Sequence, residues 1–264
     1  MRAFLAEIAR RDPVLWTTGL VHLALAVAFA VGLAVDGRVL LGVSPWLKPL
    51  KFALSIAIYV WTVAWLLGDV RAGAPRAATV ISGGVALTML VEIVCIALQS
   101  LRGVPSHFNE RAAFDGAVFG LMGFMILLNT LLATALLLVY LAVPTGLPGP
   151  YLWAVRLGLA LFLLGSGVGP LMVSRGAHAV GVPDGGPGLP FVNWSTEGGD
   201  LRVAHAVGLH ALQLLPLAAW ALGRARSLSE AGQTVAVCGL AAVSLVAFAL
   251  LLRQALDGRP VAPL

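Results

Sequence analysis

Ionisable residues stand inside three long apolar stretches of this sequence. Lys51, Glu92 and His210 each lie among predominantly apolar neighbours. A lysine can hold an anion, a carboxylate can carry a proton or bind a cation, and an imidazole can transfer protons or ligate a metal. Such side chains are costly in apolar surroundings, so their presence there favours a role in binding or proton transfer.

Polar residues recur at helical spacing around Lys51 and around Glu92. Because side chains three or four residues apart share one face of a helix, each set forms a stripe on an otherwise apolar helix. Polar stripes on membrane helices face protein or water, so we expect both to point inward. The alternative is that they only form hydrogen bonds between helices. The stripes consist of Lys48, Lys51, Ser55, Tyr59 and Thr62, and of Thr88, Glu92, Cys95 and Gln99.

The richest polar stretch surrounds the histidines at 205 and 210. Asp200 is a suitable N-cap for the helix that follows it. At about 100° per residue, the polar side chains of this helix fall within an arc of roughly 140°. Polar loops at 102–109 and 193–199 are expected to open on the same side of the membrane. The candidate ligand-binding residues are Lys48, Lys51, Glu92, Gln99, His107, Asn109, Asn193, Glu197, Asp200, Arg202, His205, His210 and Gln213.

The histidines suggest two cofactor alternatives. Zinc or iron could be held by Glu92, His107, His205 and His210, since imidazole and carboxylate suit both metals. Two histidines five residues apart do not share an ideal helical face, so this site needs a bent helix or only one of the pair. A b-type haem could take His22 and His210 as axial ligands.

Transport or binding of a small anionic or lipid-like molecule is the second functional class. Lys48, Lys51, Arg202 and His205 would form a cationic entrance, and Glu92 would take up a proton. Transport predicts a water-filled cavity that reaches past Glu92, whereas a metalloenzyme predicts a closed cluster of ligands. In a third interpretation the polar groups only hold helices together. The sequence does not decide between enzyme, transporter and scaffold.

Composition identifies the solvent in which these elements fold. Of 264 residues, 59% are hydrophobic and only 11% are charged, and the mean hydropathy is +0.95. A soluble domain carries roughly 25% charged residues, so most of this chain must contact the lipid bilayer. The net charge of +5 comes from single residues scattered among loops and helix ends. That pattern fits lipid headgroups and argues against nucleic-acid binding.

Seven stretches reach the roughly 20 apolar residues that span a bilayer as a helix. Backbone amides in lipid must be satisfied within each segment, so we predict an all-α transmembrane bundle. We expect residues 1–264 to form one domain, with an interfacial segment at 1–12 and a Gly/Pro-rich loop at 174–200. The predicted helices are 14–35, 46–68, 77–101, 115–140, 150–173, 201–222 and 231–252.

One further arginine lies inside an apolar stretch. Arg156 follows Tyr151 and Trp153, and such aromatic residues are typical of the membrane interface. Because a long arginine side chain can reach the headgroups from near a helix end, we expect Arg156 to extend toward them.

The distribution of arginines gives a weak indication of orientation. The positive-inside rule places the more basic side in the cytoplasm, so we predict a cytoplasmic N-terminus in a bacterial inner membrane. Oligomeric state has no signal in the sequence. The N-terminal side carries Arg2, Arg10, Arg11, Arg71, Arg76, Arg224 and Arg226, and the other side carries Arg38, Arg102, Arg111, Arg175, Arg253 and Arg259.

Three segments resemble the signature segments of an uncharacterised family of bacterial multi-pass integral membrane proteins. They are Ser-Pro-Trp-Leu-Lys-Pro-Leu-Lys-Phe at 44–52, Gly-Val-Pro-Ser-His-Phe-Asn at 103–109, and the run from Asn193 to Gln213. The resemblance covers most of the chain. It implies an integral membrane protein and no particular activity.

Overall fold

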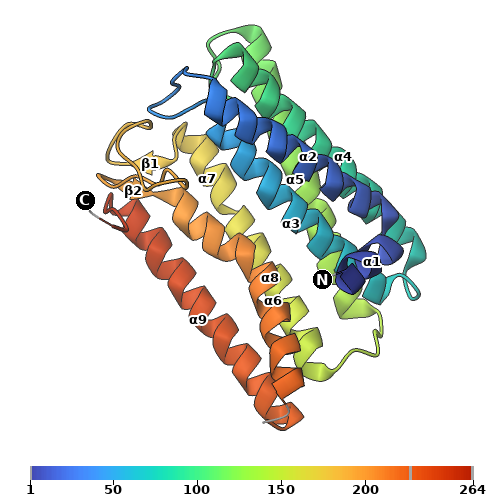
Figure 1. Cartoon of the computed structure of the whole chain (residues 1–264). Coiled ribbons are helices and arrows are strands. Elements are labelled where there is room, and N and C mark those ends of the chain that lie inside the picture. Colours follow the sequence, from blue (N-terminus) through green and yellow to red (C-terminus); the bar gives the residue numbers. More distant parts are fainter. Residues whose placement is uncertain (1, 226–227, 263–264) are drawn as a thin grey trace. The chain divides into compact units, whose positions relative to one another are not determined.

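The computed structural model describes residues 2–225 and 228–262, which form nine helices and one short two-stranded sheet (Figure 1). The strands pair antiparallel, with Ala179 opposite Asp200. Arg226, counted above on the N-terminal side, lies outside the described residues. The elements are α1 (Arg2–Arg11), α2 (Pro13–Val35), α3 (Leu47–Val70), α4 (Pro75–Arg102), α5 (Ala113–Ala142), α6 (Gly149–Ser166), α7 (Val168–Arg175), β1 (Ala179–Val180), β2 (Gly199–Asp200), α8 (Leu201–Ala225) and α9 (Glu230–Leu256).

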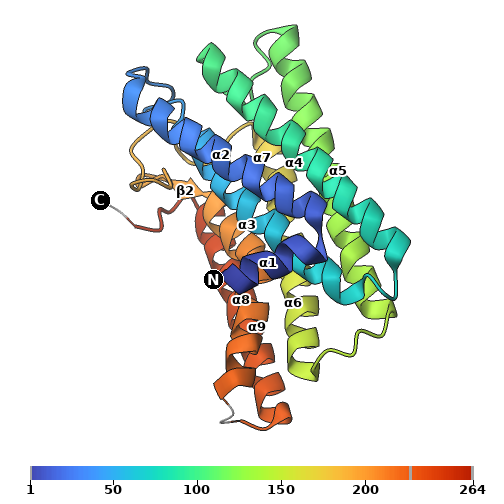
Figure 2. The same ribbon diagram turned by 45° about the vertical axis from the view of Figure 1, so that its right-hand side comes forward.

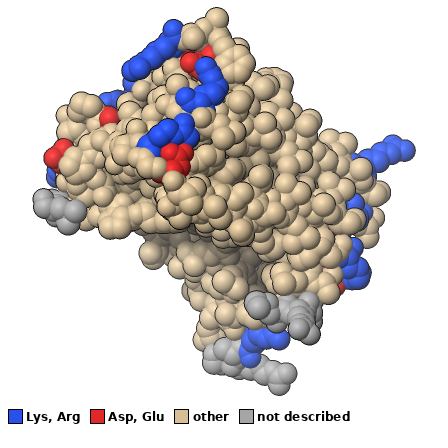
Figure 3. Space-filling view, turned by 45° about the horizontal axis from the view of Figure 1, so that its top comes forward, with Lys and Arg blue, Asp and Glu red and all other residues tan. Residues whose placement is uncertain are grey.

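Seven helical segments of the described chain are long and apolar enough to cross a bilayer. Their outer faces carry large aliphatic side chains, such as Val27, Val94 and Val235, each more than half exposed. On the face shown in Figure 3, most of the surface carries no Lys, Arg, Asp or Glu. The predicted all-α bundle is confirmed, and the protein is a multi-pass integral membrane protein. The spans are Pro13–Val35, Leu47–Val70, Pro75–Arg102, Ala113–Ala142, Gly149–Arg175, Leu201–Arg224 and Glu230–Leu256.

The fifth span is interrupted at Gly167, which the sequence prediction of an unbroken helix at 150–173 missed. α6 ends at Ser166 and α7 begins at Val168. Pro170 has no N–H to donate to the carbonyl of Ser166, so the regular ladder of hydrogen bonds cannot continue through this point.

The chain forms two compact units that divide between Leu136 and Leu137. Unit 1 contains α1 to α4 and most of α5, and unit 2 contains α6 to α9 and both strands. The proposal of a single seven-helix domain stays a prediction.

In unit 1, two glycines of α2 pack against tryptophan rings, one from α3 and one from the residue just before α3. A Cβ on Gly19 would lie 2.1 Å from Nε1 of Trp61, and a Cβ on Gly32 would lie 2.7 Å from the ring of Trp46. Trp61 also stacks on Trp16 of α2, with ring centroids 5.1 Å apart. These contacts hold α2 beside α3, and α4 packs against both helices (Figures 1 and 2).

The N-terminal helix α1 is tied to the end of α3. Arg11 donates to a carboxylate oxygen of Asp69 at 2.6 Å and to the carbonyl of Trp65 at 2.8 Å. Hydrogen bonds from Arg10 and Arg11 lower the pKa of Glu7 to about 2. This helix lies within the segment predicted at 1–12, and the position of that segment on the membrane surface stays a prediction.

A buried carboxylate joins the start of α2 to the neighbouring helices. Asp12 caps α2 by accepting from the backbone N–H of Leu15 at 2.9 Å. The same oxygen accepts from Ser82 Oγ at 2.9 Å, and the other oxygen pairs with Arg71 at 2.5 Å. All of these contacts lie at the end of unit 1 that carries the N-terminus.

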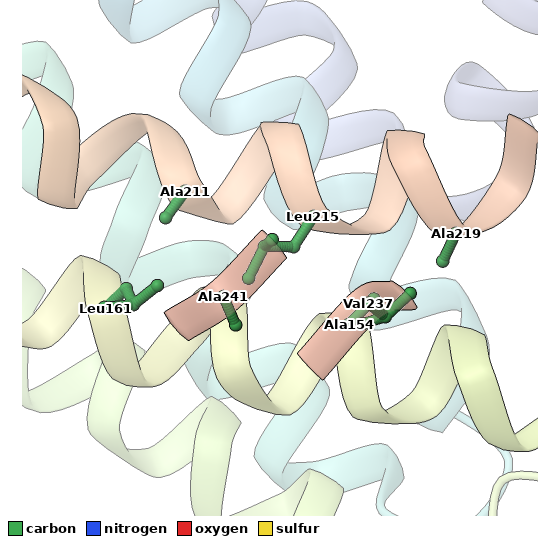
Figure 4. Packing of buried hydrophobic residues seen from close by; sticks show 7 residues of the cluster. All are labelled: Ala154, Leu161, Ala211, Leu215, Ala219, Val237 and Ala241. Atoms are coloured by element: carbon green, nitrogen blue, oxygen red, sulfur yellow. The ribbon is translucent and has the colours of Figure 1, made fainter. Parts of the chain in front are cut away.

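In unit 2, α6 and α8 approach each other most closely at two glycines. A Cβ on Gly208 would lie 2.5 Å from Cα of Gly165, so both positions require a glycine. Small and aliphatic side chains of α6, α8 and α9 interlock along the rest of this contact (Figure 4). They are Ala154, Leu161, Ala211, Leu215, Ala219, Val237 and Ala241.

Gly208→Ala should destabilise the protein, because the new methyl group meets the backbone of α6 and forces the helices apart. Such overpacking costs about 1–3 kcal/mol. Gly239→Ala on α9 is the matched control, since a Cβ there meets nothing within 4 Å. The control should be neutral or more stable by up to about 1 kcal/mol, because alanine is the better helix former. Thermal unfolding of both variants in detergent measures the contrast, and equal melting temperatures would contradict this account of the contact.

Candidate functional site

Glu92 is the centre of the polar constellation in unit 1. It lies ten residues before the end of α4 at Arg102, or about 15 Å at 1.5 Å per residue. That depth corresponds to the middle of a bilayer core about 30 Å thick. Thr88, Glu92, Cys95 and Gln99 are all buried, so the predicted inward stripe of this helix is confirmed.

The loop between α4 and α5 folds over Glu92. Ser106 and Asn109 of this loop are buried, and Nε2 of His107 lies 3.9 Å from Oε1 of Glu92. The imidazole packs near the rings of Phe52 and Phe119, with centroids 6.0 Å away in both cases. The other carboxylate oxygen, Oε2, is buried and has no hydrogen-bond partner among the described residues.

Lys48, at the start of α3, completes this constellation. Lys48 acts electrostatically on Glu92, and its ammonium lies 5.9 Å from the ring centroid of Phe52. Lys51 is half-buried one turn further along the helix, whereas Ser55 is exposed. The prediction that the whole α3 stripe points inward is therefore wrong at Ser55, because the face of α3 that packs in unit 1 is set by aliphatic residues such as Ile56 and Val60.

A buried network anchors the loop that carries His107. Gln99 donates to Asp115 Oδ1 at 3.0 Å, and Arg102 pairs with the same carboxylate and with the Gln99 side-chain oxygen. Asn109 donates to the carbonyl of Pro105 at 3.2 Å and closes the loop on itself. Asp115 was missed as a functional candidate. An acidic residue in the first turn of an apolar helix was the available signal.

The candidates near the start of α8 form a separate set of contacts within unit 2. Asp200 accepts from the backbone N–H of Arg202 at 3.0 Å, which confirms the predicted N-cap, and its carboxylate pairs with the Arg202 guanidinium at 2.6 Å. Arg202 also donates to the carbonyl of Asn193 at 2.5 Å. Ser195 donates its backbone N–H to Asp200 at 2.8 Å, whereas Glu197 is exposed. These contacts order the loop at 176–200.

The remaining α8 candidates point in different directions. His205 is half-buried, and its Nδ1 lies 2.8 Å from the carbonyl oxygen of Gly165. His210 is exposed, although it falls within the same predicted polar arc as His205. The Oε1 atom of Gln213 is buried. Whether this set shares one chamber with Glu92 stays a prediction.

The cofactor alternatives gain no geometric support. No group of three or more His, Cys, Asp or Glu within the described ranges is arranged to hold a metal ion. The two ring nitrogens of His22 lie 2.7 Å from the carbonyl oxygen of Thr18 and 3.3 Å from that of Met89. Haem ligation by His22 would require it to give up one of these contacts. The metal and haem sites stay predictions.

Arg156 binds the last turn of α5, and its extension toward the headgroups stays a prediction. Its Nε and Nη2 atoms donate to the carbonyl oxygen of Tyr140 at 3.0 and 2.8 Å. A helix would pair that carbonyl with the N–H of residue 144, but residue 144 is a proline and has none. Arg156 therefore supplies the hydrogen bonds that a backbone N–H at position 144 would otherwise donate. This role is structural.

The loop at 176–200 holds a histidine–aspartate pair that sequence reasoning missed. Asp184 Oδ2 lies 2.8 Å from Nδ1 of His178, and the carboxylate also accepts from the backbone N–H groups of His178 and Ala179. Burial raises the pKa of Asp184, but these hydrogen bonds outweigh burial and hold that pKa well below its usual range. The pair folds the loop back toward β1.

Comparisons with protein-family models, with curated proteins and with solved structures find no match to this chain. Any function must therefore be inferred from the geometry of the site. Membership of the family that the three signature segments resemble stays a proposal.

The loop at 176–200 should loosen in acid. A depressed pKa in the folded state means that ionised Asp184 stabilises the loop above its ordinary pKa of 3.8, and that this stabilisation is lost as the pH falls below that value. Asp184→Asn should loosen the same segment at neutral pH. Hydrogen–deuterium exchange of the amides at 176–200 measures both effects, with the loop at 143–147, which contains no carboxylate, as internal control. Unchanged exchange in Asp184→Asn would show that the pair does not hold the loop.

Proposed function

We propose that this protein couples the binding or transport of a small anionic solute to proton uptake at Glu92. The observation that supports the proposal is a carboxylate buried near the middle of the membrane, with a histidine 3.9 Å away and one oxygen that lacks a hydrogen bond. Ionisable groups at this depth are functional candidates, because a charge there costs about 2.5–3.5 kcal/mol on insertion scales.

Proton uptake would change the electrostatics of the whole constellation. When Glu92 is ionised, its charge offsets part of the positive charge of Lys48, which acts on it directly. When Glu92 is protonated, that offset disappears and the positive field of Lys48 becomes stronger. An anion would then bind more tightly, and by linkage a bound anion would favour the protonated carboxyl group. Anion and proton would therefore bind together.

His107 would connect Glu92 to water. The imidazole lies on a loop, its side chain is 21% exposed, and one ring nitrogen faces the carboxylate. Imidazole can accept a proton at one nitrogen and release one from the other, which suits a relay between solvent and a buried acid. We further propose that the site opens on the side opposite a cytoplasmic N-terminus, in a bacterial inner membrane.

Glu92→Gln should abolish proton movement driven by the anion, because glutamine keeps the shape of the side chain but carries no exchangeable acidic proton. The protein is reconstituted in vesicles that contain a pH-sensitive dye, and a panel of small carboxylates and inorganic phosphate is added outside. The wild type should acidify the lumen with at least one of them, and Glu92→Gln should reduce that rate to the level of empty vesicles.

Glu110→Gln is the matched control, since Glu110 is an exposed carboxylate on the same loop as His107. It should retain the wild-type rate. Loss of the signal in both variants, or in neither, would exclude Glu92 as the proton carrier. Stoichiometric zinc or iron in the purified wild type would favour the metalloenzyme alternative instead.

A further inference from the structure

A cavity of about 430 Å³ lies at the end of α9 in unit 2, where this helix packs against β1 and β2. α9 has 27 residues and is therefore about 40 Å long, which exceeds a bilayer core of about 30 Å. One or both of its ends then extend beyond the hydrocarbon core, toward the lipid headgroups. The cavity is lined by Leu250, Arg253, Gln254, Asp257, Arg259 and Pro260.

The polar rim of the cavity has a net positive charge. Arg253 and Arg259 approach the same carboxylate oxygen of Asp257 at 3.9 and 2.5 Å, so one negative charge faces two guanidinium groups. Their side chains remain 81% and 71% exposed. A guanidinium presents its N–H groups in a planar fork that matches the oxygens of a phosphate.

The turn that brings Arg259 to the rim is well fixed. Gln254 donates from Nε2 to the carbonyl of Pro260 at 2.7 Å, and Arg259 donates its backbone N–H to the carbonyl of Gln254 at 3.1 Å. Gly258 adopts a φ of 72°, a conformation that glycine accepts without strain. The second guanidinium is therefore held near the first by the backbone.

An aliphatic stripe leads along α9 to this rim. Val243, Val246, Leu250 and Arg253 follow a spacing of three, four and three residues, so they share one face of the helix. The three aliphatic side chains are 64%, 57% and 64% exposed. From Val243 to Arg253 the stripe is about 15 Å long. A cationic rim above an exposed aliphatic stripe matches a molecule with a phosphate at one end and a hydrocarbon chain at the other.

We propose that this cavity and stripe bind one anionic phospholipid from the surrounding bilayer. Its phosphodiester lies between Arg253 and Arg259, and an acyl chain lies along Leu250, Val246 and Val243. Asp257 opposes the lipid charge and limits the affinity. This proposal is independent of the function proposed for Glu92.

Native mass spectrometry of the full-length protein tests the proposal, with phosphatidylglycerol and phosphatidylcholine of identical acyl chains as probes. The wild type should bind one phosphatidylglycerol about tenfold more tightly than phosphatidylcholine, because both lipids carry the phosphodiester that the arginines bind, but the arginines repel the choline cation of phosphatidylcholine. The double variant Arg253→Gln and Arg259→Gln should lose that preference. Asp257→Asn should increase it, because the opposing carboxylate is removed. A gain of affinity cannot arise from misfolding.

Arg224→Gln is the matched control, because Arg224 is also a helix-end arginine of unit 2 but stacks on Trp220, 4.4 Å from the ring centroid. It should keep the wild-type preference. Equal binding of the two lipids by the wild type would show that this surface only contacts bulk lipid and has no preference for an anionic headgroup. Displacement of phosphatidylglycerol by inorganic phosphate at comparable concentration would indicate a site for free anions, and both results would overturn the proposal.

Discussion

Polar groups inside a bilayer core have no water to bind, so each must find its partner within the protein. This constraint explains most of the buried polar contacts in the two units. Pro144 leaves the carbonyl of Tyr140 without its helical donor, and Arg156 supplies two N–H groups in its place. Asp12 and Asp115 each pair with an arginine and accept at least one further hydrogen bond. Charge and hydrogen bonding are balanced locally at each of these points.

Glu92 departs from this pattern. Nε2 of His107 lies 3.9 Å from Oε1 of Glu92, beyond hydrogen-bond distance. The other oxygen, Oε2, has no hydrogen bond within the described part of the chain. A purely structural carboxylate would be expected to resemble Asp12, whose oxygens are both occupied. This difference between the two acids is the physical basis for the proposal that Asp12 has a structural role and that Glu92 exchanges protons. The contacts of Gln99, Arg102 and Asp115 then explain why the loop with His107 is held over Glu92.

Much of the fold follows from the sequence, because hydropathy and helix length alone locate membrane spans. The inward stripe of α4 was equally predictable, since polar residues at helical spacing on a membrane helix face protein or water, not lipid. The break at Gly167 was less visible, as it depends on one proline four residues after Ser166. Within the site, the pairing of Glu92 with His107 required the path of a loop, which periodicity does not encode. The prediction that the α3 stripe points inward was wrong at Ser55, because exposing a single serine hydroxyl to lipid costs little free energy.

The two tryptophan contacts on α2 have a consequence for how unit 1 can change shape. Gly19 and Gly32 lie 13 residues apart and each accepts one indole ring. If α2 slid past α3 by one helical turn, each ring would meet a residue that carries a Cβ. The stacking of Trp61 on Trp16 and of Trp46 on Phe29 would be lost together. Sliding is therefore blocked at two points along the same pair of helices. Conformational change in this half of the chain must keep α2 and α3 together as one rigid body. Under the transport function proposed above, alternating exposure of Glu92 would then come from the loop above it or from movement of other helices.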